Sequence, residues 1–250
     1  MKRMDDCFID LTITSPPYDN LREYNGFSFD FENVANQLYT KTKDGGILVW
    51  NVADATIDGS ETGTSFKQAL FFMDCGFKLH DTMIYQKTGT PFPSKVRYNQ
   101  TFEYMFVFSK GKPQTFNPIM KKNVTAGDFR NTRKFRQKNG NLSKAKQSFG
   151  INEYGIENNI WKINNGMFKS TNDKIAFEHP AIFPEELVKK HIYSWSKKGD
   201  LIYDPFMGSG TTAKMAHLQN RNWIGSEISK EYTELANKRI EKYINQTTLF

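Results

Sequence analysis

The chain has 250 residues, of which 38% are hydrophobic and 14% aromatic, enough for one large domain or a domain with a sizeable insertion and too many for a disordered or fibrous chain. No apolar stretch approaches the roughly 18 residues of a membrane helix, acids near the N-terminus argue against a signal peptide, and two cysteines, Cys7 and Cys75, favour buried thiols in a reducing cytoplasm over a disulfide framework. The net charge of +7 is concentrated, because the window from Lys110 to Gly150 holds eleven basic residues and one acid, which leaves the rest of the chain net acidic.

Strand and helix patterns alternate along the first part of the chain. An apolar run from Phe8 to Thr14 predicts a strand that must stop at the prolines behind it. Apolar residues at helical spacing follow between residues 31 and 38, and two glycines then open a strand over Ile47–Val52. The other elements predicted here are a helix on the spacing of Phe66, Leu70 and Met73, and strands over residues 79–86 and 101–109.

Regular alternation resumes after about Asn159, beyond a polar middle segment. A helix with Pro184 near its start is predicted to bury a face that runs from Leu187 to Trp195. The remaining elements are a strand at 200–203, a helix at 211–218, a strand at 223–226 and a final helix that Ser229 is placed to cap. Strands alternating with helices predict an α/β fold with a doubly wound, mostly parallel sheet.

The basic middle segment indicates a polyanion bound at one place rather than a generally basic surface. Phe129, Asn131, Phe135 and Gln137 are interleaved with its cations, and aromatic and amide side chains beside arginine suit contact with bases. The alternative is a solvated loop that keeps the protein soluble. The predicted DNA-binding residues are Lys121, Lys122, Arg130, Arg133, Lys134, Arg136 and Lys138.

A glycine-rich motif, residues 204–212 (DPFMGSGTT), lies directly between a predicted strand and a predicted helix. Such a turn lets the backbone approach a ligand closely. Glu227 follows Gly208 by nineteen residues, at the end of the next strand, where nucleotide-binding sheets hold a ribose diol. No Gly-Lys-Ser/Thr follows, and Asp204 would repel a pyrophosphate, so the motif favours a cationic nucleoside.

A second motif, Thr14-Ser15-Pro16-Pro17-Tyr18, ends the first strand. Two prolines fix the backbone, so that a carbonyl and the Ser15 hydroxyl can accept hydrogen bonds from one exocyclic amine while Tyr18 offers a flat face to a planar ring. Alone, the tetrapeptide favours a Pro-Pro turn with a packed tyrosine over an amine site.

Together these motifs resemble those of the S-adenosylmethionine-dependent amino-methyltransferases of DNA, in the motif order of the circularly permuted β class. The resemblance implies a Rossmann-like methyltransferase fold in which a flipped base meets the catalytic residues Ser15, Pro16, Pro17 and Tyr18. By the same resemblance, S-adenosylmethionine is expected to contact Asp204, Phe206, Gly208, Ser209, Gly210, Thr211, Glu227, Ile228 and Phe183.

The resemblance also divides the chain into a catalytic half (1–110), a basic target-recognition region (111–170) and a cofactor-binding half (171–250). Residues 178–184 resemble the segment beside the methionine moiety, and residues 102–110 the strand that walls the base pocket. His179 is interpreted as structural. Family members usually carry an acid that reads the cofactor's adenine, and here either residues 1–6 or 246–250 would stand in for that segment.

The function implied is methyl transfer to an exocyclic amine of double-stranded DNA without a metal, in a prokaryotic or phage-encoded protein. Serine at position 15 resembles the members that methylate cytosine N4, whereas those that act on adenine N6 more often have aspartate there. Methylation of RNA or of a protein glutamine, and a catalytically silent DNA-binding subunit, are the alternatives. A homodimer and a cognate restriction endonuclease are left open.

Overall fold

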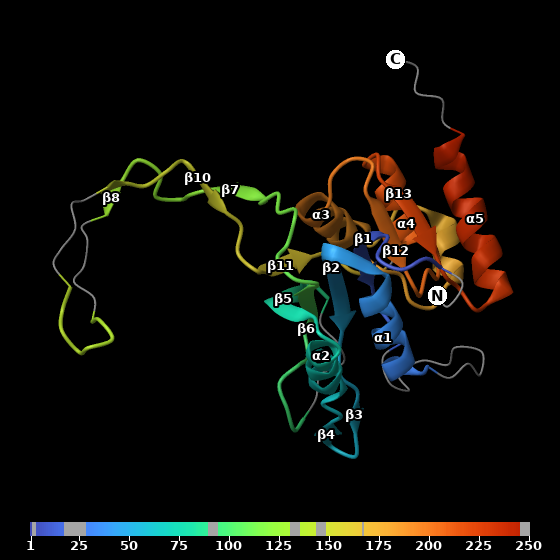
Figure 1. Ribbon diagram of the computed structural model, residues 1–250, viewed down its shortest axis with the longest axis horizontal. Coiled ribbons are helices and arrows are strands. Elements are labelled where there is room, and N and C mark those ends of the chain that lie inside the picture. Colours follow the sequence, from blue (N-terminus) through green and yellow to red (C-terminus); the bar gives the residue numbers. More distant parts are fainter. Residues whose placement is uncertain are drawn as a thin grey trace. The chain divides into compact units, whose positions relative to one another are not determined.

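The computed structural model describes residues 1, 4–17, 29–89, 95–130, 136–143, 149–166 and 168–245, with the backbone alone at 129, 130 and 149. Two compact units make up the chain, one from Met1–Asn117 and Asn159–Phe250 and the other from Pro118–Asn158 (Figure 1). The second unit falls within the basic region set at 111–170, and the flanks of that region belong to the first unit. In the part of the chain described, no helix is long and apolar enough to cross a membrane.

A seven-stranded sheet forms the first unit. Its strands are β1 (Ile9–Thr14), β2 (Thr42–Val52), β5 (Lys78–Lys87), β6 (Phe102–Ser109), β11 (Ile160–Ile163), β12 (Leu201–Asp204) and β13 (Asn222–Gly225). They lie in the order β11-β5-β6-β2-β1-β12-β13. Strand β6 is antiparallel to both of its neighbours and the other four pairings are parallel, so the predicted mostly parallel sheet is confirmed.

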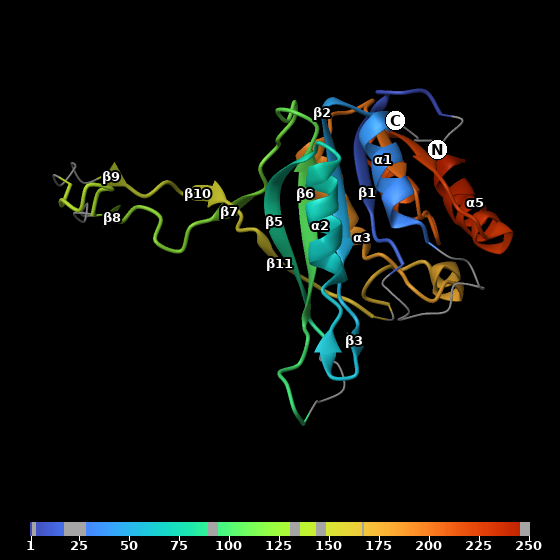
Figure 2. The ribbon, with the colours of Figure 1, turned by 60° about the horizontal axis from the view of Figure 1, so that its bottom comes forward.

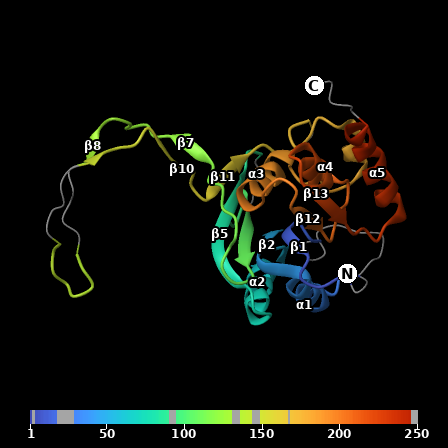
Figure 3. The same ribbon diagram turned by 45° about the horizontal axis from the view of Figure 1, so that its top comes forward.

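Helices cover both faces of this sheet. Helices α1 (Phe31–Lys41) and α2 (Thr64–Asp74) pack on one face, and α3 (Glu185–Trp195) lies across the other (Figure 2). Helices α4 (Thr211–Leu218) and α5 (Lys230–Ile244) pack together beside β12 and β13 (Figure 3). Ser229 caps α5 by accepting a hydrogen bond of 3.3 Å from the Tyr232 N–H, as predicted. A 3-10 helix, η1 (Lys174–Glu178), and a hairpin of β3 (Thr56–Ile57) and β4 (Ser60–Glu61) complete the unit.

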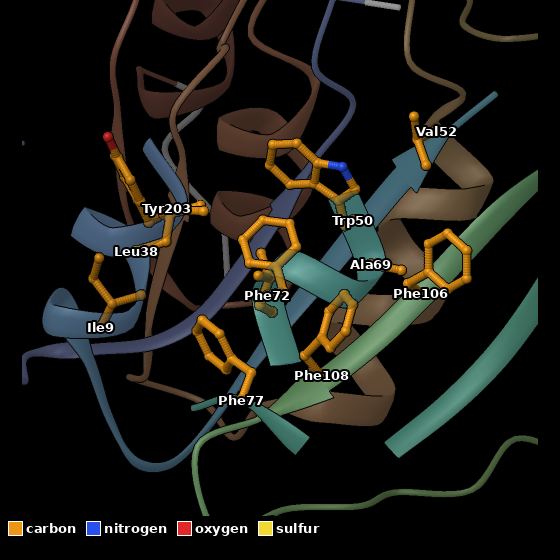
Figure 4. Close-up of a cluster of buried hydrophobic side chains, with 12 residues drawn as sticks. Ile9, Leu38, Trp50, Val52, Ala69, Phe72, Phe77, Phe106, Phe108 and Tyr203 are labelled. Atoms are coloured by element: carbon orange, nitrogen blue, oxygen red, sulfur yellow. The ribbon is translucent and has the colours of Figure 1, made fainter. Parts of the chain in front are cut away.

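An aromatic core lies between the sheet and helices α1 and α2 (Figure 4). Trp50 of β2 is fully buried, and its ring meets that of Phe72 edge-on, with centroids 4.9 Å apart. The Trp50 indole N–H donates to the Gln68 side-chain oxygen at 2.8 Å, so the polar tip of this large side chain is satisfied inside the core.

The buried face of α2 differs from the prediction. The apolar side chains on which the helix was predicted are exposed, at 49%, 62% and 44% for Phe66, Leu70 and Met73. The buried residues are Ser65, Gln68, Ala69 and Phe72. Two polar contacts explain this orientation, because Asp54 accepts from the Ser65 N–H and hydroxyl at 2.8 and 2.6 Å and Gln68 accepts from the core tryptophan.

The structure differs from the sequence predictions in two further respects. Strand β11 was not predicted, since it is four residues long and its position depends on pairing with the distant strand β5. The prediction of two buried thiols is wrong, because Cys7 is exposed and Cys75 is only partly buried.

The second unit consists of short antiparallel pairs. Strand β7 (Met120–Lys122) pairs with β10 (Tyr154–Ile156), and β8 (Phe129–Arg130) pairs with β9 (Phe149–Gly150). An isolated bridge joins Arg136 to Leu142.

Candidate active site

The carboxyl ends of the neighbouring parallel strands β1 and β12 lie side by side in the sheet. From this point β1 leads through α1 to β2 on one side, and β12 leads through α4 to β13 on the other. Ligands of doubly wound folds bind where the strand order reverses in this way. A cleft of about 1450 Å³ opens at this edge and is lined by both sequence motifs.

Asp204, at the tip of β12, joins the two motifs. One carboxylate oxygen accepts from the Thr14 hydroxyl at 2.6 Å and from the Phe206 N–H at 3.0 Å, and the other accepts from the Thr212 hydroxyl at 2.6 Å. Burial raises the pKa of Asp204 to about 6, against the lowering effect of these three donors. The carboxylate therefore fixes the strand ends and the glycine turn. Asp204 also lines the cleft, and its contact with a ligand's cationic end stays a prediction.

Both glycines of the turn have a left-handed backbone, and each lies close to a different neighbour. Gly208 has φ +49° and lies against His179, whose Nε2 would be 3.0 Å from an added Cβ. Gly210 has φ +79° and packs on α5, where an added Cβ would be 3.1 Å from that of Ala236. Gly208 lines the cleft, whereas Gly210 is not among its lining residues and permits close helix packing.

Glu227 is held over the glycine turn after β13. One carboxylate oxygen accepts from the Gly208 N–H at 2.8 Å and the other from the Ser229 N–H at 3.0 Å. Sequence reasoning had paired this acid with the turn by spacing alone. The structure joins them directly, so the acid faces the cleft in a fixed orientation.

Apolar side chains wall the same part of the cleft. Phe183, Phe206 and Ile228 line it, and Ile228, which lies just before the cap of α5, is 67% exposed. The ring of Phe29 meets that of Phe206 edge-on at 5.0 Å. Phe29 was missed in the sequence because it precedes α1 and carries no local pattern.

The other end of the cleft is formed by β5 and β6. Lys87 forms an ion pair of 2.6 Å with Glu103, which also accepts from the Asn51 amide at 2.5 Å. Tyr85 lies beside them, and burial together with the Glu103 carboxylate raises the pKa of its hydroxyl above the ordinary value. Tyr85 and Lys87 were not predicted, whereas the β6 segment containing Glu103 was.

The structure brings most of the predicted catalytic and cofactor-binding residues into one cleft. Those among its lining are Ser15, Pro16, Pro17, Phe183, Asp204, Phe206, Gly208, Ser209, Thr211, Glu227 and Ile228. Tyr18 and residues 246–250 lie outside the described residues. His179 accepts from the Ala181 N–H at 3.1 Å and packs against Tyr232, consistent with a structural role.

The predicted DNA-binding residues belong to the second unit. Lys121 and Lys122 lie on β7 with exposed side chains, and Arg136 and Lys138 are exposed as well. Lys122 has an acidic neighbour, Glu153, at 3.5 Å. Arg130 is described by its backbone alone, and Arg133 and Lys134 lie outside the described residues.

A nucleoside with a cationic, amino-acid-bearing tail fits the described cleft. Glu227 offers a carboxylate to a diol, the apolar wall suits a flat ring, and the left-handed turn at Gly208 lets the main chain approach without a side chain. Among the residues that the structure describes, no three or more His, Cys, Asp or Glu side chains are grouped so that they could hold a metal ion.

Comparisons with known proteins show the family of this chain. Residues 9–238 match the N6/N4 methyltransferase family model, described as DNA methylase. The orphan methyltransferase M.BamHII of Bacillus amyloliquefaciens is 56% identical over 245 residues, which cover 97% of this chain and 92% of that protein. The type II methyltransferase M.MthZI of Methanothermobacter thermautotrophicus is 26% identical over 99% of this chain and 74% of its own length.

Solved structures show the same fold. A putative DNA modification methylase of Thermus thermophilus, complexed with S-adenosyl-L-methionine, has a TM-score of 0.66 at 22% identity, covering 98% of this chain and 90% of its own. The PvuII DNA methyltransferase, titled cytosine-N4-specific, has a TM-score of 0.65 at 20% identity over 98% of this chain and 87% of its own.

Proposed function

Since this chain belongs to the N6/N4 family of DNA methylases, we propose that it transfers a methyl group from S-adenosylmethionine to the N4 amine of a cytosine flipped out of DNA. The observation that carries the proposal is the hydrogen bond of 2.6 Å between Thr14 and Asp204. It ties the Ser-Pro-Pro motif to the glycine turn, so that an amine and a methyl donor share one cleft.

The cofactor half of the cleft is assigned to the glycine turn and Glu227. When bound there, S-adenosylmethionine supplies an electrophilic methyl group. Glu227 binds the ribose hydroxyls, Ile228 and Phe183 cover the apolar parts, and Gly208 leaves room for close approach of the main chain. Asp204 holds the turn at the end of β1, because its carboxylate accepts hydrogen bonds from Thr14 and from Thr212.

The Ser-Pro-Pro motif holds the amine. Ser15 and the Pro16 carbonyl accept its hydrogens, which raises the electron density on nitrogen and directs its lone pair toward the cofactor half. Pro17 keeps the backbone from turning away, and Tyr18 provides the stacking face. Catalysis is then mostly alignment, since a positioned amine needs no covalent intermediate.

The second unit supplies target binding. Its exposed lysines and arginines neutralise phosphates, and these contacts offset the few kcal/mol needed to extrude a base. Lys121, Lys122 and Lys138 are assigned to the DNA backbone, whereas Arg130, Arg133 and Arg136 are candidates for base edges, by bidentate contact with guanine. Lys134 is assigned to DNA binding without a more specific role.

Cytosine is favoured over adenine by the serine at position 15. Adenine N6 is the second candidate, because either amine presents the same two hydrogens to this motif. A protein glutamine is disfavoured by the basic second unit. A homodimer and a cognate endonuclease stay predictions.

The test is methylation of DNA by the purified protein, followed by digestion to nucleosides and mass spectrometry. N4-methyldeoxycytidine is expected, with none from Ser15→Ala, and N6-methyldeoxyadenosine would move the target to adenine. A folded protein that binds S-adenosylmethionine and DNA but yields no methylated nucleoside would contradict the proposal and favour the silent subunit. RNA in the same assay covers the remaining substrate class.

A further inference from the structure

A buried arginine lies beneath the glycine turn, outside the cleft lining. Arg239 is on α5 and its side chain is 0% exposed. Its NH1 donates to the Ser209 carbonyl at 2.9 Å, to the Ser209 hydroxyl at 3.1 Å and to the Thr211 hydroxyl at 3.0 Å. The guanidinium therefore contacts the turn at a main-chain carbonyl and at two side chains.

The same guanidinium contacts a second segment that borders the cleft. Its Nε donates to Asp173 at 2.9 Å, and NH2 donates to Thr171 at 3.2 Å and to Glu185 at 2.6 Å. Ser170, directly before this segment, lines the cleft. Arg239 thus joins the glycine turn to residues 171–173 and to Glu185 at the start of α3.

Two lysine side chains contact the same acids. Lys214 donates to Asp173 at 2.9 Å and to Glu185 at 2.6 Å, and Lys242 donates to Asp173 from the rim, where its side chain is 48% exposed. Burial alone would raise the pKa of Asp173, but the donors Lys242, Lys214, Tyr243 and Arg239 hold it well below its usual range. Asp173 therefore stays ionised beside the arginine.

The planar fork of arginine is needed for this arrangement. Its donors point in fixed directions and reach three sides of one plane, whereas an ammonium is a single point of charge on a flexible stem. Lysine at this position could keep the charge but could not reach the Ser209 carbonyl, Asp173 and Glu185 together.

We propose that Arg239 is the positioning residue of the glycine turn: it fixes the Ser209–Thr211 backbone in the conformation that receives S-adenosylmethionine. The inference rests on the proposed function, because it assigns the turn to that cofactor. Arg239 acts through Ser209 and Thr211 and touches neither cofactor nor base.

The first test compares Arg239→Lys with Lys242→Met, which removes another donor to Asp173 from the same helix but leaves the turn contacts intact. Binding of S-adenosylmethionine is measured by calorimetry on full-length, folded protein. Arg239→Lys is expected to raise the Kd by about tenfold or more, in line with loss of charge-assisted hydrogen bonds. Lys242→Met is expected to keep the wild-type Kd.

A merely structural role would affect other properties too. We expect Arg239→Lys to bind DNA like the wild type and to keep kcat within about threefold at saturating cofactor, so that the change appears in KM. Without cofactor, hydrogen exchange at the amides of 208–211 should be faster in Arg239→Lys and unchanged in Lys242→Met.

The outcomes separate this inference from the proposed function. A wild-type chain that does not bind S-adenosylmethionine overturns the proposed function. A wild-type chain that binds it, with an unchanged Kd in folded Arg239→Lys or an equal loss in Lys242→Met, overturns the role of Arg239 alone. If Arg239→Lys does not fold, Thr211→Val decides, because it removes one hydroxyl that faces Arg239. Thr211 also lines the cleft, so the readout is hydrogen exchange without cofactor: faster exchange at the amides of 208–211 supports the role, and wild-type exchange overturns it.

Discussion

Basic side chains are buried in the first unit of the chain and exposed in the second. In the first unit Arg239 and Lys214 have side chains 0% and 5% exposed, and buried carboxylates surround them. In the second unit Lys122 is 68% exposed, and its acidic neighbour Glu153 is 60% exposed at 3.5 Å. A buried cation must be paired and so fixes the backbone around it, whereas an exposed cation keeps its charge available to a polyanion.

The largest effect is expected from removing the acid at the centre of the buried network. Asp173→Ala leaves Arg239, Lys214 and Lys242 without their shared carboxylate, and breaking one partner of a buried pair costs about 3–5 kcal/mol. Chemical denaturation measures the free energy of unfolding. The matched control, Glu153→Gln in the second unit, should cost at most about 0.5 kcal/mol. Equal costs for the two variants would remove the contrast between the units.

The next effect concerns Glu227, a charge that is fixed but faces the cleft. Glu227→Ala should weaken S-adenosylmethionine binding by about 1.5–3 kcal/mol, since charge-assisted hydrogen bonds to the ribose are lost. Calorimetry provides the measurement. Ser15→Ala is the control on the amine side, and it should abolish transfer while binding the cofactor normally. Loss of cofactor binding in folded Ser15→Ala would show that the two roles are wrongly divided.

A third prediction concerns pH and the fully buried His191 of α3. Burial, assisted by Lys190, lowers its pKa to about 3, so the unfolded state takes up a proton near pH 6.5 and the folded state does not. Above pH 6.5 this difference does not affect the free energy of unfolding. Below pH 6.5 the free energy of unfolding falls as the pH is lowered, by about 2 kcal/mol at pH 5. Asp204, with its pKa raised to about 6, acts in the opposite direction below that pH.

The two contributions separate in a variant that lacks the imidazole. His191→Phe keeps Asp204, so between pH 7.5 and pH 5 it should gain about 2 kcal/mol relative to the wild type in urea unfolding. Parallel stability curves for the two proteins would show that His191 is not held neutral by burial.

Substitutions in the second unit are expected to have the smallest effect on folding and to change DNA binding alone. If about half of the eleven basic residues of the Lys110–Gly150 window contact phosphates, log K against log salt has a slope of about −4 to −5. Replacing Lys121, Lys122 and Lys138 with Gln should reduce its magnitude by up to about 2.7 and weaken all sequences alike. The control replaces three exposed lysines of the first unit, Lys198, Lys230 and Lys238. A flat salt response in the wild type would mean that the segment is a solvated loop.

Sequence patterns predicted what depends on neighbours in the chain. The Ser-Pro-Pro motif, the glycine turn and the cap at Ser229 are local, because prolines, glycines and a capping hydroxyl restrict the backbone where they stand. Glu227 was also within reach, since its distance from the turn along the chain is set by one helix and one strand. The Ser-Pro-Pro motif, the glycine turn, Ser229 and Glu227 all contribute residues to the described cleft lining.

What the sequence could not provide depends on distant partners. Arg239 and Lys214 look like solvated residues on amphipathic helices until Asp173 and Glu185 meet them. The face of α2 was predicted from Phe66, Leu70 and Met73, yet hydrogen bonds to Asp54 and Trp50 determine which side is buried. Pairing of β11 with β5, across more than seventy residues, is of the same kind.

Two asparagines stand where the chain leaves the sheet unit and where it returns. The Asn117 N–H donates to the Ser194 carbonyl at 2.8 Å and its side-chain amide to the Tyr193 carbonyl at 2.9 Å. At the other junction the Asn159 carbonyl accepts from the Ile84 N–H at 2.8 Å. Both ends of the intervening stretch are thus held to the first unit by hydrogen bonds that do not involve the residues between them. On the proposed function, in which the intervening stretch binds the target, replacing it whole with the matching stretch of a relative is expected to change the DNA sequence that is methylated while leaving the cleft residues as they are.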